Sequence, residues 1–400
     1  MKIAILTSGI LPIPSVQGGA VEKLIDHYLE YNHQHRLHDI TVFSVLHPGV
    51  LAHPALLSDV NHYQYIDMGS FPAKIRKRLY ALAHPHGYYH YSIGYYLRQA
   101  IRIIEKSNDY DCIILENRPG YALPLRHATR AKLVCHLHND FLNAATVHGH
   151  AIYEATAGIL TVSDYIRSRV QTCCPQDTKT VTVHNGIDLG SFARQPAITR
   201  QSLGLAADDF ILVFSGRLIP EKGIVELIEA MHMLKDETSV SLLVMGSSFY
   251  DNASNQDDPF IAELRSKAEG LGDRIRFTGY VRHELMPDYL RLADVAVVPS
   301  TWDDPFPTTV LEGMAAGLPL ITTNRGGIPE MATSRNAVVV AYPGDFVNGL
   351  ARAISYLHHN ARERAAMGEA SLQLSRQYSK EAYAKNFFDA LTRCVETATP

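Results

Sequence analysis

The chain alternates short apolar, β-branched runs with longer segments of helical periodicity, and it does so twice. In the first half the runs are Ile3–Leu6, Ile40–Val45, Cys112–Leu115, Lys132–His136 and Ile159–Val162. In the second half they are Phe210–Phe214, Ser241–Met245, Arg274–Thr278, Val295–Val298, Leu318–Thr322 and Ala337–Val340. Strands that alternate with helices predict parallel sheets covered by helices on both faces. With 400 residues, 46% of them hydrophobic, the chain can bury two such cores.

The alternation lapses between about Leu189 and Asp209, in a polar stretch punctuated by glycine and proline. We therefore predict an α/β protein of two doubly wound domains facing a cleft. The predicted parts are a first domain over 1–190, a linker over 191–208, a second domain over 209–375 and a C-terminal helix over 376–400. Apolar residues recur at helical spacing in the last part, so this helix is expected to dock, with the first domain as one candidate partner.

The overall charge excludes a polycationic nucleic-acid binder. The 37 basic and 41 acidic side chains leave a formal net charge of −4. Five scattered cysteines do not form a disulfide scaffold. The apolar start, Met1–Leu6, is too short for a signal peptide and is interpreted as a first strand, and no run approaches a membrane span. We expect a cytoplasmic protein, with any membrane contact at the inner face and peripheral.

Ligands of open α/β sheets bind at the carboxyl ends of the strands, so residues that follow strands are the candidates for a site. After Phe214 the chain reads Ser-Gly-Arg-Leu-Ile-Pro-Glu-Lys-Gly, and a helix is predicted to begin near Pro220 or Glu221. Gly216 permits a tight turn, while Arg217 and Lys222 bracket the predicted helix N-terminus. Two cations at such an end favour a phosphate or diphosphate. The alternative is a pair of solvated charges beside a turn.

A second segment follows the strand Val295–Val298, with acids and prolines in a loop and a helix predicted from about Thr308. Thr308 and Thr309 can offer backbone N–H groups and hydroxyls to an anion. Glu312 lies one turn into the helix and can accept hydrogen bonds from vicinal hydroxyls, as on a ribose. Asp304 can reach another hydroxyl or developing charge. In the alternative interpretation, these acids only favour a helix N-terminus or form surface ion pairs.

These segments resemble family 4 glycosyltransferases, whose two Rossmann-like domains form the GT-B fold. Asp304 and Glu312 match the family's acid-x7-acid motif, although its first acid is commonly Glu. The other matching segments are Gly18-Gly19, Val183–Asp188, Gly216–Gly223, Thr278–Val281 and Gly326–Glu330. After Met245 the usual Gly-x-Gly is replaced by Gly246-Ser247-Ser248-Phe249-Tyr250. With Glu116–Pro119 and Leu137–Asp140, this variant is similar to transferases of capsule, exopolysaccharide and lipopolysaccharide assembly.

The resemblance implies retaining transfer of a sugar from a nucleoside diphosphate sugar, of UDP or GDP type, to a glycan or glycolipid hydroxyl. It implies no metal, no other cofactor and no nucleic-acid partner. The residues expected to carry catalysis are Arg217, Lys222 and Asp304. Those expected to bind the donor are Gly18, Gly19, His138, Asn185, Gly216, Arg217, Lys222, Tyr280, Asp304, Phe306, Pro307, Thr308, Thr309 and Glu312.

Two further patterns imitate metal sites. His136-x-His138 ends a strand, so both side chains point to one face, but zinc would need more ligands than this pair offers. The resemblance instead places His138 against the donor sugar. Asp109-Tyr110-Asp111 imitates the metal-binding Asp-x-Asp of single-domain glycosyltransferases, but it precedes a strand and is interpreted as a turn.

A basic cluster, Lys74, Arg76, Lys77 and Arg78, adjoins apolar and tyrosine-rich segments. It fits contact with anionic lipid or a phosphorylated glycolipid, or else an ordinary solvated helix face.

Three other functions stay open: a nucleotide-sugar epimerase, a phosphorylase on the same fold, and a non-catalytic sugar-nucleotide-binding partner. Analysis of the reaction products distinguishes a transferase from the other two enzymes, because a transferase releases nucleoside diphosphate only when an acceptor is present. A plain dehydrogenase is disfavoured, because no Gly-x-Gly-x-x-Gly follows the first strand.

Overall fold

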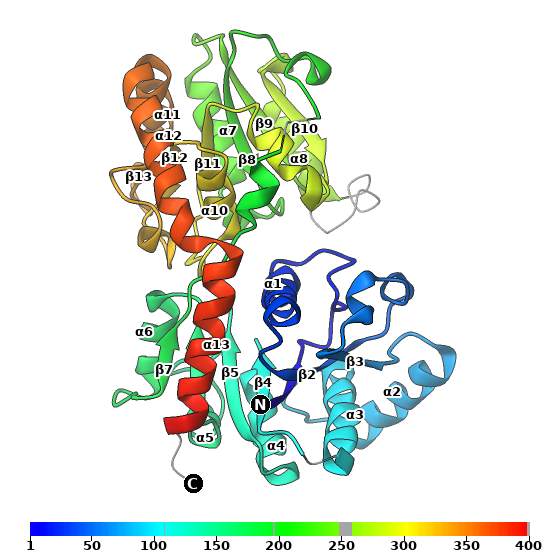
Figure 1. Cartoon of the computed structure of the whole chain (residues 1–400). Helices are drawn as coiled ribbons and strands as arrows, with labels where there is room; N and C mark the ends of the chain where they lie inside the picture. Colours follow the sequence, from blue (N-terminus) through cyan, green and yellow to red (C-terminus); the bar gives the residue numbers. More distant parts are fainter. Residues whose placement is uncertain (108, 195–196, 248–257, 398–400) are drawn as a thin grey trace. The chain divides into compact units, whose positions relative to one another are not determined.

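The computed structural model describes residues 1–107, 109–194, 197–247 and 258–397 (Figure 1). Two parallel sheets, each with helices on both faces, confirm the predicted fold class. Contacts divide the chain into two units. Unit 1 comprises Met1–Asn185 and the chain from Glu381 onward, and unit 2 comprises Gly186–Lys380. Ser248, Phe249 and Tyr250, in the segment that departs from Gly-x-Gly, lie outside the described residues.

The sheet of unit 1 has seven parallel strands in the order β3-β2-β1-β4-β5-β6-β7. They are β1 Lys2–Leu6, β2 Asp39–Val45, β3 Asn61–Ile66, β4 Cys112–Glu116, β5 Lys132–Leu137, β6 Gly158–Thr161 and β7 Thr180–Thr182. The two strands that the sequence did not predict, β3 and β7, are the two edges of the sheet. Because an edge strand is only partly covered, β3 carries polar residues (Asn-His-Tyr-Gln) that hide the apolar pattern.

The helices of unit 1 are α1 Ala20–His35, α2 Phe71–Ala83, α3 Tyr91–Ser107, α4 Ala122–Ala128, α5 Gly149–Ala155, α6 Asp164–Cys173 and α13 Lys380–Thr397. The last of these lies beside α1 on one face of the sheet, where the Phe387 ring stacks on Tyr28 with centroids 4.2 Å apart. Gly158 of β6 leaves room for it, since a Cβ there would lie 2.4 Å from Cys394 Sγ. The C-terminal helix is therefore part of the core of unit 1.

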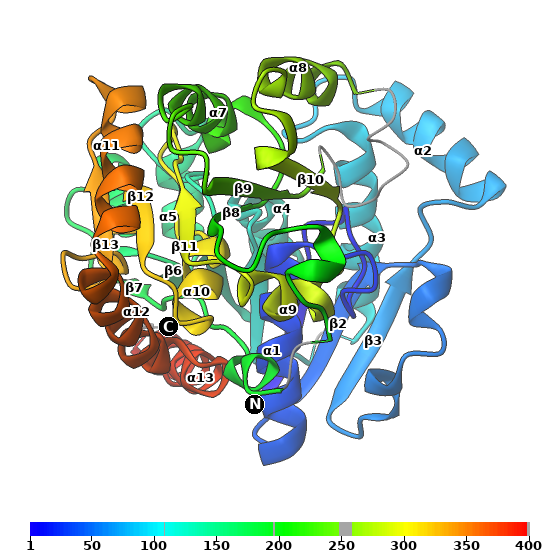
Figure 2. The same cartoon turned by 90° about the horizontal axis from the view of Figure 1, so that it is seen from above.

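Unit 2 has six parallel strands in the order β10-β9-β8-β11-β12-β13. They are β8 Phe210–Ser215, β9 Val240–Met245, β10 Ile275–Gly279, β11 Val295–Val298, β12 Leu320–Thr323 and β13 Ala337–Val340. The helices are α7 Ile224–Met233, α8 Pro259–Ala268, α9 Met286–Leu290, α10 Thr308–Ala315, α11 Phe346–His359 and α12 Ala361–Ser375. Figure 2 shows α7, α8 and α11 on one side of this sheet and α9, α10 and α12 on the other.

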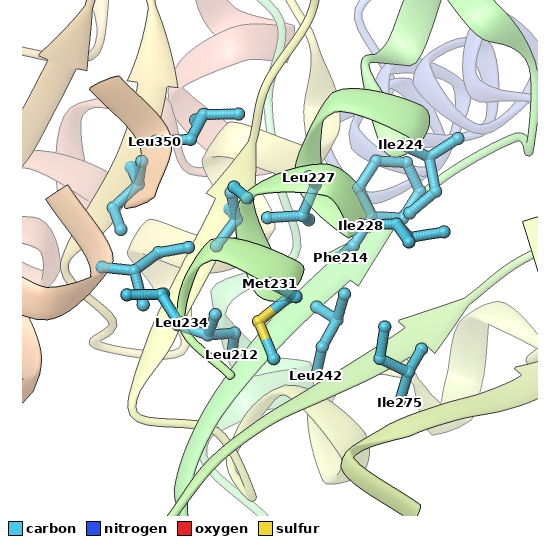
Figure 3. Packing of buried hydrophobic residues seen from close by; sticks show 14 of the residues in the cluster. Leu212, Phe214, Ile224, Leu227, Ile228, Met231, Leu234, Leu242, Ile275 and Leu350 are labelled. Carbon is cyan, nitrogen blue, oxygen red and sulfur yellow. The ribbon is translucent and has the colours of Figure 1, made fainter. Parts of the chain in front are cut away.

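One face of the helix after β8 is apolar and buried. Ile224, Leu227, Ile228 and Met231 of α7 pack on sheet residues that include Leu212 (Figure 3). This burial holds the loop between β8 and α7 in place, because both of its ends are anchored in the core.

The stretch expected as a linker, 191–208, belongs to unit 2, apart from 195–196, which lie outside the described residues. Arg200 explains its attachment: the guanidinium donates to the carbonyl of Leu292 and pairs with Asp294 at 2.9 Å. The contact boundary falls earlier, between Asn185 and Gly186. Within unit 2, the chain just after this boundary forms a bridge from Ile187 to Ser379, close to the return to unit 1.

Among the described residues, no helix combines the length and apolar character needed to cross a bilayer.

Candidate functional site

The loops after four neighbouring strands of unit 2 converge at the carboxyl edge of its sheet. A Cβ on Gly246, after β9, would lie 1.9 Å from the carbonyl oxygen of Gly216, after β8. A Cβ on Gly326, after β12, would lie 2.1 Å from the carbonyl oxygen of Asp304, after β11. Only glycine allows such approaches of one backbone to another. The predicted motif residues on these loops therefore share one edge.

The helix after β8 begins later than predicted. Pro220–Lys222 form a 3-10 turn, Gly223 is left-handed with φ +72°, and α7 starts at Ile224. The predicted start of this helix, near Pro220 or Glu221, was wrong for the α-helix because Gly223 interrupts it: a Cβ on Gly223 would lie 1.9 Å from Pro299 O. The turn places Lys222 toward the site, with its side chain only 17% exposed.

Lys222 and Asp304, predicted separately, form an ion pair. Lys222 Nζ lies 2.5 Å from Asp304 Oδ2, and the Asp304 side chain is only 6% exposed. The ammonium group also lies 5.6 Å from the centre of the Trp302 ring. Arg217 differs: it is exposed, and the described part of the chain gives its guanidinium no partner. One predicted cation is thus balanced by a carboxylate and the other is open to an anion.

The N-terminus of α10 lies beside the turn after β8. Pro307 occupies the cap position and provides no side-chain hydrogen bond, so Thr308 and Thr309 lead the helix with uncapped first-turn amides. A Cβ on Gly216 would lie 3.9 Å from Thr309 Cγ2. Phe306 is buried and packs edge-on against Tyr378 at 5.7 Å, which anchors the loop before the helix. Free amides at a helix start are suited to a phosphoryl group.

Glu312 is buried in α10, and burial raises the pKa of its carboxyl to about 8. The nearest cationic candidate is His283, whose Nδ1 lies 3.9 Å from Glu312 Oε1. Near pH 7 the carboxyl is therefore largely protonated. Its ionisation at higher pH destabilises the folded chain, because the charge is buried. Such a placement is typical of a functional acid. Tyr280 is half-buried just after β10, within the same sheet edge.

In unit 1, Gly18 and Gly19 precede α1 with φ of +80° and +97°. A Cβ on Gly19 would lie 2.2 Å from Glu22 Oε2. Burial raises the pKa of Glu22, an acid that the sequence did not single out, to about 7. Asn185 is buried at the end of the unit.

His138 lies just after β5, where it belongs to a buried cluster with Glu116 and His136. The two imidazoles face the same side of the sheet, as the strand period predicted. Burial lowers the pKa of His138 to about 4, so its ring is neutral at pH 7. Burial opposes ionisation of Glu116, but the two histidines hold its pKa below the ordinary value. Asp109-Tyr110-Asp111 lies just before β4, outside any helix or strand, with Lys2 paired to Asp109.

Sequence reasoning gave Glu116, Glu22, His283 and Trp302 no role. One signal was available for Glu116: it ends an otherwise apolar strand, Cys-Ile-Ile-Leu, at a position that alternation assigns to the covered face. A charged residue at such a position needs a partner. The partners lie about 20 residues further along the chain, which spacing alone does not reveal.

Unit 1 also contains a pocket of about 440 Å³ between α3, α4 and the segment before α3. Tyrosines line much of it, and Arg98, Arg102 and Glu105 add charge. Aromatic faces beside a few polar groups are suited to an amphipathic ligand.

Residues 197–373 match the family described as glycosyl transferases group 1. A putative glycosyltransferase of Bacillus subtilis, YtcC, is 29% identical over 374 residues, covering 89% of this chain and 84% of that protein. The lipopolysaccharide 1,2-N-acetylglucosaminetransferase of Salmonella typhimurium is 26% identical over 263 residues, covering 64% of this chain and 66% of that protein.

Among solved structures, Anabaena Alr3699/HepE in complex with UDP and glucose matches with a TM-score of 0.74. The match covers 98% of this chain and all of that chain, at 20% identity. At this identity the likeness shows the fold, which is that of GT-B glycosyltransferases.

Proposed function

We propose that this chain is a group 1 glycosyltransferase, which the match of residues 197–373 and the similarity to YtcC support, and that it moves a sugar from a nucleoside diphosphate sugar to a hydroxyl of a glycan or glycolipid. One observation carries the donor class: Arg217, Lys222 and the uncapped start of α10 gather at one sheet edge of unit 2. Two cations and free amides complement two linked phosphoryl groups. The similarity to a protein solved with UDP and glucose supports the same donor class.

Within this proposal, Glu312 accepts hydrogen bonds from the ribose hydroxyls and Tyr280 lies near the base. Arg217 and Lys222 meet the diphosphate, and Asp304 with the Phe306–Thr309 backbone orients the sugar. The resemblance adds four residues of unit 1 to those expected to bind the donor: Gly18, Gly19, His138 and Asn185. The pair between Lys222 and Asp304 gives Asp304 a second role, because it holds the ammonium group in place before a phosphate arrives.

We further propose retention of the anomeric configuration without a metal. Arg217, Lys222 and the α10 amides would stabilise the departing nucleoside diphosphate, and a donor phosphate oxygen would accept the acceptor's proton. Full activity after chelation, together with a product of unchanged anomeric configuration by NMR, would support both parts. Inversion, or activity restored only by added metal, would contradict them.

The experiment that tests the donor class is a thermal-shift screen of UDP, GDP, ADP and their sugars. A ligand that binds only the folded chain raises its melting temperature by mass action. We expect one nucleoside diphosphate and its sugars to stabilise the chain, and Arg217→Ala to weaken that stabilisation. If none of the three nucleotides shifts the transition at millimolar concentration, the proposed donor class is wrong.

We propose that the acceptor belongs to cell-surface polysaccharide synthesis, in line with the similarity to a lipopolysaccharide N-acetylglucosaminetransferase. Such acceptors are carried on membrane lipids, and α2 is suited to a lipid surface. Phe71, Ile75, Leu79 and Leu82 are exposed at helical spacing, with fractions of 77%, 44%, 60% and 80%. Four cations and no acids share this helix. An apolar stripe flanked by cations is typical of peripheral membrane helices.

Changing Lys74, Arg76, Lys77 and Arg78 together to serine is expected to abolish sedimentation with anionic phosphatidylglycerol vesicles, because each cation near the surface contributes about 1 kcal/mol. Neutral phosphatidylcholine vesicles serve as the lipid control, and serine at the exposed Arg352 and Lys385 serves as the charge control. Unchanged binding of the fourfold variant would remove the membrane role of α2.

A further inference from the structure

Glu116 ends β4, and His136 and His138 occupy alternate positions at the end of β5. All three point to the face of the sheet that α1 and α13 cover. Ile114 and Val134 lie two residues before Glu116 and His136, so they share this face, and both belong to the core formed with α1 and α13. The exposed fractions are 0% for Glu116, 0% for His136 and 6% for His138. A carboxylate with this little access to water is stable only when nearby groups donate hydrogen bonds to it.

Three side chains supply those hydrogen bonds. His138 Nε2 lies 2.9 Å from Glu116 Oε2, and His136 Nδ1 lies 3.2 Å from the same carboxylate. The Tyr28 hydroxyl, from α1, donates to Glu116 Oε1 at 2.9 Å. A further hydrogen bond fixes the backbone, because the His138 N–H donates to Asn117 Oδ1 at 3.1 Å. The ring of His138 is thus held by the last residue of β4, Glu116, and its main chain by the next residue, Asn117.

An ionised carboxylate can only accept hydrogen bonds, so each ring nitrogen that faces Glu116 must carry a proton. For a neutral His138 the proton is then on Nε2, and Nδ1 keeps a lone pair. This Nδ1 is buried and has no hydrogen-bond partner among the described residues. Buried nitrogens without a partner are rare and call for an explanation.

His136 also has an unpaired ring nitrogen, Nε2, but its surroundings differ. It lies inside β5, with its ring 5.2 Å from the Phe387 ring of α13. His138 comes after the last strand residue, Leu137, at the carboxyl edge where ligands of such sheets bind. His138, rather than His136, therefore lies at the edge of the sheet where a ligand would bind.

We propose that Glu116 is a positioning residue that keeps the His138 proton on Nε2, so that Nδ1 accepts a hydrogen bond from a hydroxyl of the donor sugar. This inference rests on the proposed function, which places His138 beside that sugar. It adds the direction of the contact: the protein accepts and the sugar donates. A site built to pair with a hydroxyl discriminates strongly against a sugar that lacks it.

The first test needs no donor. In protein labelled with ¹⁵N-histidine, His138→Gln identifies the His138 signals, and couplings to the ring carbon-bound protons tell Nε2 from Nδ1. We expect wild-type His138 at about pH 7 to show a protonated Nε2 and an unprotonated Nδ1. Glu116→Gln should convert this into a mixture of tautomers. A proton on Nδ1 in the wild type, or a doubly protonated ring, would overturn the proposal even if Glu116→Gln fails to fold.

The second test measures donor turnover with UDP-glucose, or with GDP-mannose if GDP is the nucleotide that stabilises the chain. Glu116→Gln and His138→Gln are each expected to lower kcat/KM by about 10- to 100-fold, with bare nucleotide affinity unchanged. Since Glu116 acts through His138, the double variant should fall within about twofold of His138→Gln. Multiplied losses, or equal loss of bare nucleotide affinity, would instead indicate a general structural role.

Glu237→Gln is the matched control. Glu237 also binds a histidine, with the His358 Nδ1 at 2.8 Å, but it lies before β9, away from the carboxyl edge of its sheet. Turnover should stay within about twofold of wild type. The zinc alternative is checked by elemental analysis of the purified chain. One equivalent of zinc, lost in both Glu116→Gln and His136→Gln, would overturn the proposal, because the ring nitrogens that face Glu116 would then bind metal.

Discussion

Arg217→Ala and Lys222→Ala are each expected to lower kcat by at least about 10²-fold, through lost stabilisation of charge on the departing nucleoside diphosphate. The two variants should differ in stability. Arg217 is exposed, so its loss should leave the melting temperature unchanged. Removing Lys222 leaves Asp304, with a side chain only 6% exposed, without its cation, so this variant should also melt earlier.

Steady-state kinetics and thermal melts of the two variants check this prediction. Asp304→Asn combined with Lys222→Ala should recover the melting temperature without recovering turnover, because it removes the unpaired charge but restores no cation. Lys267→Ala is the matched control, since Lys267 also pairs with acids but lies on α8 outside the predicted site. Near-wild-type turnover in both alanine variants would refute the placement of the diphosphate.

Glu312→Gln is expected to weaken nucleotide binding and to stabilise the chain at high pH. The carboxyl pKa is about 8 in the folded chain, above its ordinary value, so the folded state binds this proton more tightly than the unfolded state. The stability gained from that proton is complete at acidic pH and is lost as the pH rises through about 8. Glutamine never ionises and escapes this loss.

The melting temperature of Glu312→Gln should therefore match the wild type near about pH 5 and exceed it by at least about 4 °C near about pH 9. Nucleotide affinity, measured by calorimetry near about pH 9, should fall about 10-fold or more, because the ionised carboxylate can accept from both ribose hydroxyls and glutamine offers only one acceptor oxygen. Glu226→Gln is the control, because it makes the same substitution on a different helix, α7. An unchanged affinity would remove Glu312 from the ribose, whatever the stability shows.

The fold was largely predictable because a buried strand requires a run of apolar residues, and such runs can be recognised in the sequence. All six strands of unit 2 were expected, with ends shifted by at most two residues. The edge strands β3 and β7 were missed, because strands covered on fewer sides need fewer apolar residues. The start of α7 was misplaced, because the close approach of Gly223 to Pro299 depends on a loop some 75 residues away.

The candidate site was predictable only in part. Local motifs indicated which residues follow strands and can offer a charge or an amide. They did not indicate that Lys222 and Asp304 would form an ion pair, or that Glu116 would form a hydrogen bond with His138. In both pairs the residues lie on or after strands that are neighbours in the sheet but separated in the chain.

The sequence alone determined the alternation of strands and helices, the face on which each strand residue lies, and the glycines and charges placed after strands. These are local properties, set by a two-residue period and by backbone freedom at single positions. Tertiary structure decided protonation and pairing: the raised pKa of Glu312, the ion pair of Lys222 and the hydrogen bonds around Glu116. Those depend on burial and on which strands adjoin, because a charge responds to everything within a few ångströms, however distant along the chain.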